Sequence, residues 1–513
     1  MTYNLSSLPP IADAPEQLLP IDCDATAVLH LTDGRASSEM SYCFPGREFI
    51  LSAHPITLGP VSVGYMFPLS FLTIIGRAAA CTLLLTDSSL RTISLAKDAS
   101  GITIRLQFDE SVAPHRLLLI GHAPDWHCGL DLYQRWYYSR HGRRRLDPRL
   151  AGCFHLWRCF LHPELAPGSP GHKAGFAEEM QRLQDEFGGA EALLLFDLGY
   201  DPHTRVRCGN TAIYPASLPR KLLRDVQESG LLQIYYLDPY LVQEKSPLFH
   251  ALPDSIWQTD SARRPLRVWR DDEWAPCLTE PLWQDICRGQ LATATTQLRL
   301  DGVYFDELGF GTTYPCCSPD HAHAKPIDQP RAELEFVDNV TPPDLLRLCE
   351  AFPSDHELPA FHAALSDASS TVDILRFAHP EVRIFKMTQC DRPGDDLAGC
   401  LDKSLFNGEG FFIGNDIGNE QWYPAAIRQR IRRNHAILCR YAAIFDSPDC
   451  TPLVPLHSVC LANRFRCGDE VILTLLNPAA TPQTLAVGDQ QLTIAPGAVR
   501  VIYQHGSDCH TVL

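Results

Sequence analysis

Two acidic residues end an apolar stretch near the middle of the chain, in the sequence Asp301-Gly-Val-Tyr-Phe-Asp306-Glu307. Side chains alternate along a β-strand, so Asp306 should share a face with Tyr304, while Val303 and Phe305 point the other way. Carboxyl groups gathered near one axis are suited to glycoside hydrolysis, in which one is the acid and another the nucleophile or base. Asp306 is therefore the first candidate for a catalytic residue.

Other polar residues follow, or lie within, apolar stretches that we interpret as strands. In a barrel of parallel strands the active site forms at their carboxyl ends, so these residues are candidates for binding substrate. An acid after a strand can also be a helix cap or a loop contact, and an aromatic ring can simply pack. The candidates for substrate binding are Asp197, Tyr236, Asp238, Glu307, Lys386, Asn407 and Glu409, with Trp157 as a ring for stacking on a sugar.

From Cys153 onward, apolar stretches of strand length alternate with amphipathic helical stretches. Such alternation predicts a parallel sheet covered by helices. About eight strands fit a closed (β/α)8 TIM barrel better than an open sheet, and no GxGxxG or GxxxxGK[ST] phosphate-binding motif is present. The predicted strands include Cys153–Phe160, Ala192–Leu198, Leu231–Leu237, Val303–Asp306, Phe361–Leu365, Arg383–Met387 and Leu405–Phe412.

The two ends of the chain differ from this central region. Short apolar or alternating segments separated by turn residues predict all-β structure at both ends. We therefore expect a multidomain α/β and all-β protein, in which a central TIM barrel is flanked by an N-terminal β-sandwich and a small C-terminal β-sandwich. The expected divisions are residues 1–125 for the N-terminal sandwich, 126–150 for a linker helix, 151–446 for the barrel and 447–513 for the C-terminal sandwich.

Composition excludes several classes of protein. The 513 residues are 45% hydrophobic and 20% charged, which is ordinary for a globular protein. The formal net charge of −17 argues against nucleic acid and anionic membranes as partners, because binding either requires a basic surface. The chain has 19 cysteines, an odd number, and its N-terminus shows no export signal. We therefore expect reduced thiols and a cytoplasmic protein.

Six short motifs occur in an order that resembles a bacterial family of glycoside-hydrolase-like TIM-barrel proteins. The resemblance covers roughly residues 125–477, and the first barrel strands are more loosely similar to the α-galactosidase and α-amylase clans. Asp197-Leu-Gly-Tyr200 stands where the α-galactosidase clan has an Asp-Asp-Gly-Trp-like turn, without the second acid. The six motifs are Asp301–Asp306, Cys317–His323, Cys349–Asp355, Arg376–Pro380, Phe406–Gly410 and Ala462–Phe465.

The resemblance also implies roles for two carboxyl groups. An Asp that ends the fourth strand is the nucleophile in the related α-retaining clans, which is the position of Asp306, and Glu350 is then the acid/base at the end of the fifth strand. A competing interpretation places Glu350 on a helix capped by Thr341, with Pro342 in its first turn. We prefer the strand, because the barrel needs one here and Pro353 ends the apolar stretch.

Cys317, His321 and His323 offer donor types that suit zinc. The sequence shows no obvious fourth ligand, and the resemblance implies that this loop faces the substrate. We therefore expect no metal and no cofactor, and count both histidines among the residues that bind sugar hydroxyls.

These observations together predict a retaining glycosidase whose partner is a carbohydrate substrate. Two alternatives stay open. A barrel of this kind that had lost one carboxylate would bind carbohydrate without cleaving it, and a polysaccharide-modifying transferase could use the same barrel.

Overall fold

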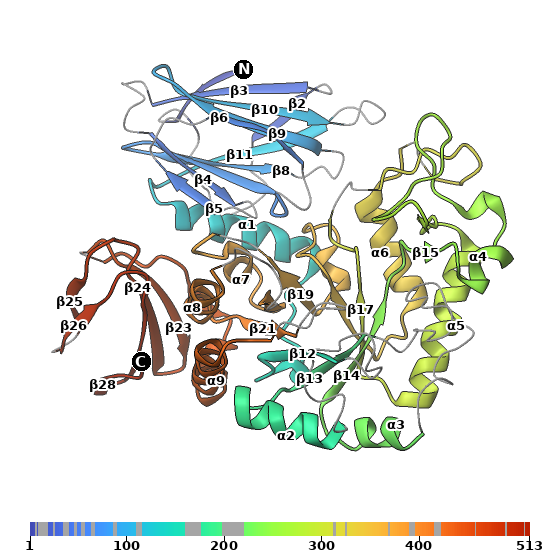
Figure 1. Cartoon of the computed structure of the whole chain (residues 1–513). Helices are drawn as coiled ribbons and strands as arrows, with labels where there is room; N and C mark the ends of the chain where they lie inside the picture. Colours follow the sequence, from blue (N-terminus) through green and yellow to red (C-terminus); the bar gives the residue numbers. More distant parts are fainter. Residues whose placement is uncertain are drawn as a thin grey trace.

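The structure of the whole chain is a computed structural model (Figure 1). It describes residues 1–5, 8, 19–23, 26–33, 40–45, 49–52, 57–62, 67–85, 90–108, 115–159, 176–196, 220–310, 314–323, 326–367, 370–388, 396–414, 422–456, 458–487, 490–506 and 508–513. Within these residues no helix has the length and apolar character that crossing a membrane requires.

The N-terminal region is a sandwich of two sheets that enclose a core of their own. Along β10 every second residue is buried, as expected for a strand with one face on a core. The first sheet has the order β1 (Thr2–Asn4), β3 (Thr26–Thr32), β10 (Ile102–Phe108), β9 (Leu90–Lys97), β6 (Thr57–Ser62). The second has the order β2 (Leu19–Cys23), β11 (His115–His122), β8 (Ala80–Leu85), β7 (Phe71–Ile75), β4 (Ser41–Pro45), β5 (Phe49–Ser52).

Helix α1 (Trp126–His141) lies between this sandwich and the barrel (Figure 1). It begins at Asp125, whose side chain accepts the backbone N–H of His127. At Gly129 the helix approaches β7 and β8 so closely that an added Cβ would lie 2.0 Å from the Thr73 hydroxyl. On the barrel side, the Tyr133 hydroxyl of α1 is hydrogen-bonded to His379 at 2.7 Å, so the helix packs against both of its neighbours.

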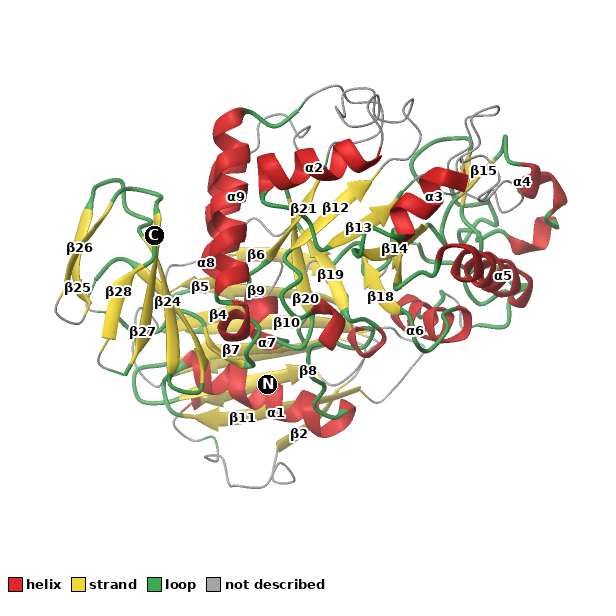
Figure 2. Ribbon diagram, turned by 90° about the horizontal axis from the view of Figure 1, so that it is seen from below, coloured by secondary structure: helices red, strands yellow, loops and turns green. Residues whose placement is uncertain are grey.

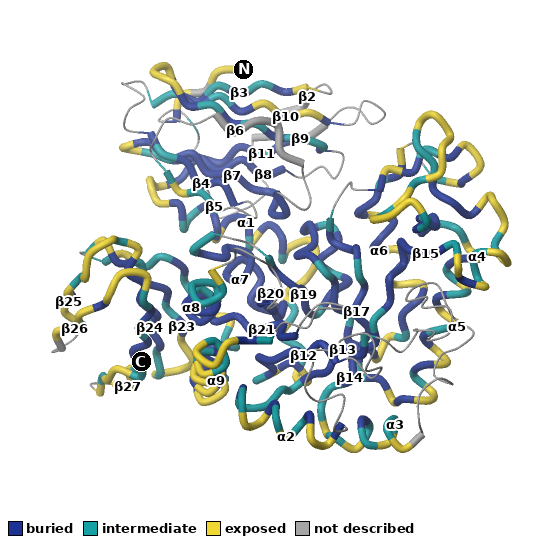
Figure 3. Tube along the Cα trace, in the orientation of Figure 1, coloured by how far each residue is buried: buried dark blue, intermediate teal, exposed yellow. Residues whose placement is uncertain are grey.

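The centre of the chain forms a closed barrel of eight parallel strands. Inward side chains such as Leu194, Ile234, Leu348 and Phe385 fill it with a compact apolar core. The strands are β12 (His155–Cys159), β13 (Ala192–Leu195), β14 (Leu232–Leu237), β17 (Gly302–Phe305), β18 (Leu346–Cys349), β19 (Ala363–Ser366), β20 (Arg383–Met387) and β21 (Gly410–Ile413). Figure 3 shows these strands as the deeply buried centre of the molecule.

Helices surround the barrel, as Figure 2 shows from below. Their outer faces carry charged side chains, and ion pairs one turn apart, such as Arg331 with Glu335, occur there. They are α2 (Phe176–Phe187), α3 (Arg220–Gln227), α5 (Pro281–Leu298), α6 (Gln329–Val340), α7 (Ile374–Ala378), α8 (Leu397–Asn407) and α9 (Ala425–Arg440).

A long excursion, residues 238–280, separates β14 from α5. It contains β15 (Val242–Gln243) and β16 (Glu273–Trp274), which pair with each other, the short helix α4 (Pro247–Ala251) and a 3-10 turn at Asp254–Ile256. Loops that follow barrel strands form the face on which substrates bind. This excursion therefore belongs to the functional face of the barrel.

The C-terminal region is a five-stranded antiparallel sheet with a small two-stranded sheet beside it. It follows α10 (Ala442–Phe445) and packs on α8, where Asn463 and Thr474 both donate hydrogen bonds to the Phe406 carbonyl. The larger sheet has the order β22 (Asp449–Thr451), β23 (Leu461–Cys467), β24 (Glu470–Leu476), β27 (Val499–His505), β28 (Asp508–Thr511). The smaller one pairs β25 (Gln483–Val487) with β26 (Gln490–Ile494). The expected architecture, a barrel with β-structure on either side, is confirmed.

One predicted strand, Leu405–Phe412, is wrong. Its first part is the end of α8, and the strand β21 begins only at Gly410. The helix ends at Gly408, whose φ of 67° is left-handed and whose missing Cβ leaves room for the rings of Phe445 and Phe465. Asn407 and Glu409 consequently precede the last strand instead of following it.

Candidate active site

The side chains that could do chemistry gather at the carboxyl ends of neighbouring barrel strands. The pairing register sets Tyr236 of β14 beside Tyr304 of β17, and Phe305 of β17 beside Cys349 of β18. One oxygen each of Asp306, Glu307 and Glu350 lies within 4.8 Å of the others. The sequence-predicted acids Asp306, Glu307 and Glu350 are therefore brought together.

Asp306 is held by two tyrosines. The Tyr236 hydroxyl donates to Oδ2, and the Tyr304 hydroxyl donates to Oδ1 at 3.0 Å. Both phenols come from inward positions of β14 and β17, so the strands themselves set the direction of the carboxylate. A carboxylate with both oxygens oriented in this way is suited to attack along one line.

Glu350 directly follows strand β18, so the strand interpretation is correct and the helix interpretation is not. Its Oε2 accepts the backbone N–H of Glu307 at 2.8 Å. Burial raises the pKa of the Glu350 carboxyl well above its ordinary value, and the charges of Asp306 and Glu307 raise it further. A carboxyl group whose pKa is raised holds its proton more tightly, which suits a general acid.

Glu307 stands in an unusual backbone conformation. Its φ of 63° lies in the left-handed region, which residues other than glycine seldom adopt and which is common at functional sites. Its Oε2 accepts a hydrogen bond from the Tyr314 hydroxyl at 2.7 Å, and its Oε1 accepts one from the Trp269 indole. Burial and the Asp306 charge raise the pKa of Glu307 to about 7, against the opposing effect of these two donors.

Asp238, which follows β14, is the fourth acid of this group. It is buried and accepts the Tyr240 backbone N–H at 3.0 Å. Burial raises the pKa of Asp238 well above its usual value, as do the charges of Asp306 and Glu307. The charge of Asp306 thus raises the pKa of each of the other three acids, and Glu307, with a pKa of about 7, is partly protonated near neutral pH.

The carboxylates could in principle hold a cation, because three of their oxygens converge. Their oxygens already accept hydrogen bonds, however: Asp306 from two phenols, Glu307 from a phenol and an indole, and Glu350 from a backbone N–H. This donor set is typical of a hydrogen-bonded carboxyl network and does not resemble an oxygen cage for a metal ion.

Sequence reasoning missed several residues at this face. Arg158 comes two residues after the inward-facing Leu156 of β12, so it faces the same side. Its guanidinium lies over the Phe196 ring, 4.1 Å from the ring centroid. Trp269 is 71% exposed although its indole N–H reaches Glu307. Asp367 comes directly after β19, at the same end of the barrel. Of these, Asp367 could have been found from the sequence, because it lies two residues beyond the predicted strand Phe361–Leu365.

Four predicted substrate-binding residues lie elsewhere. Trp157 is on the outer face of β12 and packs against Phe187 and Trp422. The side chain of Lys386 also points outward, because its neighbour Phe385 belongs to the barrel interior.

The remaining two follow from the misplaced strand. Asn407 donates to the Thr371 carbonyl at the junction with the C-terminal sheet. Glu409 is buried near Asp373 and Lys386, with its pKa raised first by burial. Asp197 lies outside the described residues.

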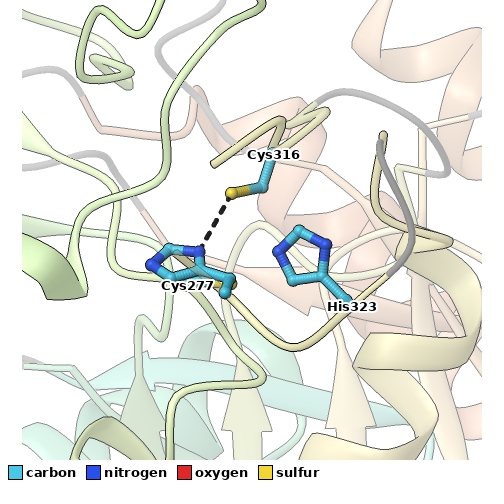
Figure 4. Close-up of side chains that lie close together, drawn as sticks. Cys277, Cys316 and His323 are labelled. Atoms are coloured by element: carbon cyan, nitrogen blue, oxygen red, sulfur yellow. Dashed lines mark hydrogen bonds between the residues drawn. The ribbon is translucent and has the colours of Figure 1, made fainter. Parts of the chain in front are cut away.

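His321 and His323 belong to a second cluster. They lie with Cys277 and Cys316, and one donor atom of each of the four residues is within 4.8 Å of the others (Figure 4). The cysteine near the histidines is Cys316 and not Cys317, whose sulfur instead contacts the Pro315 carbonyl. The two histidines thus group with thiols, apart from the four acids.

Comparison with known proteins shows a similarity of fold. No family model matches the chain, and no curated protein matches it in sequence. Among solved structures, the fold is that of glycoside-hydrolase-like TIM-barrel proteins with flanking β-domains.

The α-N-acetylgalactosaminidase NagBb from Bifidobacterium bifidum is similar with a TM-score of 0.60 and 14% identity, over 88% of this chain and 80% of that one. GH36 α-galactosidase AgaB from Geobacillus stearothermophilus is similar with a TM-score of 0.59 and 12% identity, over 90% and 69%. The galactosidase domain of the α-galactosidase-sucrose kinase AgaSK has a TM-score of 0.58 and 12% identity, over 92% and 68%. At these identities the likeness concerns the fold.

Proposed function

We propose that the protein is a retaining glycoside hydrolase in which Asp306 is the nucleophile and Glu350 the acid/base. The observation that carries the proposal is the convergence of their carboxyl oxygens within 4.8 Å. Retaining enzymes hold their two carboxyl groups ~5–5.5 Å apart, whereas inverting enzymes need ~6.5–9.5 Å to admit a water molecule between them.

The proposed reaction has two steps. Asp306 attacks the anomeric carbon while the bond to the leaving oxygen breaks, and Glu350 gives its proton to that oxygen. In the second step Glu350 takes a proton from water, whose oxygen displaces Asp306 from the anomeric carbon. The raised pKa of Glu350 fits the first step, because the acid must carry its proton at working pH.

α-Linked hexosides are the substrates to examine first, because the similar structures are described as α-galactosidases and an α-N-acetylgalactosaminidase. Trp269 supports a sugar substrate independently. Its exposed ring is tethered to Glu307 through the indole N–H and borders the acidic cluster, where an apolar sugar face could stack. Trp269→Ala should therefore raise KM, and Trp269→Phe should restore part of the loss.

The deciding experiment is a screen of aryl α- and β-glycosides followed by trapping. An activated 2-deoxy-2-fluoro analogue of the best substrate should add one glycosyl unit to the protein mass, and peptide mapping should place it on Asp306. Asp306→Asn should abolish turnover and labelling, while Asp285→Asn, an exposed change on α5, should leave both intact.

The acid/base assignment needs its own comparison, because Asp367 stands at the same rim. Glu350→Gln should slow substrates with poor leaving groups far more than activated ones. If Asp367→Asn shows this pattern and Glu350→Gln does not, the assignment of Glu350 is wrong. An inverted first product, seen by NMR, would overturn the retaining mechanism, and no turnover with sugar binding intact would favour a binding protein.

A further inference from the structure

Four side chains with nitrogen and sulfur donors meet beside the functional face of the barrel. Cys277 ends the excursion between β14 and α5, and Cys316, His321 and His323 come from the loop after β17. Their donor atoms lie within 4.8 Å of one another, and the two thiols are fully buried. Figure 4 shows Cys277, Cys316 and His323 close together, although the two segments are far apart in the chain.

The spacing matches a tetrahedral metal site. Zn²⁺ binds sulfur at ~2.3 Å and imidazole nitrogen at ~2.0–2.1 Å, so a sulfur and a nitrogen of one tetrahedron are about 3.6 Å apart. The Cys316 sulfur lies 3.3 Å from Nδ1 of His321. A shift of a few tenths of an ångström would accommodate the ion.

The surrounding groups orient the donors for a metal. Nε2 of His321 donates to the Ser255 carbonyl at 2.6 Å, which leaves the lone pair on Nδ1, the nitrogen that faces the thiol. The Thr279 hydroxyl lies 3.2 Å from the Cys277 sulfur.

Charge argues in the same direction. Thiolates are the form of cysteine that binds zinc, and a buried thiolate without a counter-charge is costly. Two thiolates and two neutral imidazoles balance the charge of one divalent ion.

We propose that Cys277, Cys316, His321 and His323 bind one Zn²⁺ in a closed, structural site. Four protein ligands leave no position for water or substrate, which distinguishes such a site from a catalytic one. The sequence alone did not predict this site, because the fourth ligand, Cys277, precedes β17 in the chain whereas the other three follow it. The cysteine that the sequence grouped with the histidines, Cys317, directs its sulfur to the Pro315 carbonyl instead.

The zinc would tie together the two segments that hold Glu307. The excursion carries Trp269 and the loop after β17 carries Tyr314, and both donate to that carboxyl group. Apart from the four ligands, the backbone bond from Cys317 to the Thr259 carbonyl at 2.7 Å also joins these segments. The metal is therefore expected to stabilise this face of the barrel without taking part in a reaction.

Metal content tests the proposal directly. The reduced full-length protein is incubated with ZnCl2, passed through a desalting column and analysed by mass spectrometry for zinc and by Ellman titration for thiols. About one retained zinc per chain is expected. Cys277→Ser, Cys316→Ser and His323→Gln should each retain little, whereas Cys317→Ser should retain as much as the natural chain.

A folding defect in the variants must be kept apart from a lost ligand. Replacing zinc by Co²⁺ in the natural chain should give the visible absorption of a tetrahedral cobalt thiolate, and removing the metal with a chelator should lower Tm reversibly. Failure of the natural chain to retain zinc would overturn the proposal, as would equal retention in the Cys316→Ser variant. A Cys277–Cys316 disulfide, seen as a loss of two thiols in protein purified without reductant and resistant to zinc, would also overturn it.

Discussion

Asp306→Asn should lower the pKa of Glu350, because the substitution removes a negative charge from the immediate neighbourhood of that carboxyl group. The two carboxyl oxygens lie within 4.8 Å of each other. At this outer limit of distance and an effective dielectric constant of ~20, two unit charges interact by about 3.5 kcal/mol, so the loss of one charge should lower the pKa of Glu350 clearly. Burial still acts on Glu350 in the variant, so its pKa should remain above the ordinary value of glutamate.

The measurement is a pH titration of the protein labelled with 13C at the glutamate side-chain carboxyl carbon. Glu350→Gln identifies the resonance, and Asp285→Asn, on the exposed surface of α5, controls for the general effect of removing one charge. A Glu350 pKa that is unchanged, or raised, in Asp306→Asn would refute the reasoning. The same shift matters for mechanism, because a glycosyl group on Asp306 removes the same charge and would turn Glu350 from an acid into a base.

Three further predictions concern stability. Gly408→Ala should destabilise the protein by about 2–5 kcal/mol in urea unfolding, since a left-handed residue with a Cβ costs ~1–2 kcal/mol and crowding of nearby rings ~1–3 kcal/mol more; no change would mean that the helix end relaxes. Ser70→Ala removes a 2.8 Å hydrogen bond to buried Asp355 across the junction of sandwich and barrel, and should cost about 1–3 kcal/mol, whereas Ser100→Ala, at an exposed turn, should cost almost nothing. Burial, with the charge of a neighbouring histidine, lowers the pKa of His155 to about 3, so the folded state binds this proton less well than the unfolded state. The stability that neutral His155 contributes is fully present above the unfolded pKa of ~6.5. Below that pH the free energy of unfolding should fall, by about 2 kcal/mol between pH 7 and pH 5. His155→Gln should flatten this dependence, and an equally steep one in the variant would contradict the assignment.

Much of the barrel could be predicted from the sequence. Strands such as Ala192–Leu195 and Gly302–Phe305 are apolar and buried on both faces, and the alternation of side chains placed Asp306 on the inward side with Tyr304. The prediction failed at Leu405–Phe412, because an apolar helix end and a short buried strand have similar compositions. The Asn407-Gly408 pair is a signal for the end of a helix, and it marks the boundary between α8 and β21 within this stretch.

The candidate site was predictable only in part, for a related reason. Lys386 and Trp157 lie in true strands, but their polar or aromatic character suggested an inward position that the alternation of their neighbours excludes. Glu350 could be placed on a strand or a helix from its own segment, and pairing with β17 decides the matter.

The sequence by itself determined the strand and helix order, the inward direction of Asp306 and the acidic character of the functional face, because these properties depend on residues a few positions apart. Only the tertiary structure decided which groups meet across long stretches of chain: Trp269 and Tyr314 on Glu307, and Cys277 with Cys316. Such meetings depend on the register of neighbouring strands and on the paths of loops, which are set by packing over the whole barrel and leave no periodic signal in the sequence.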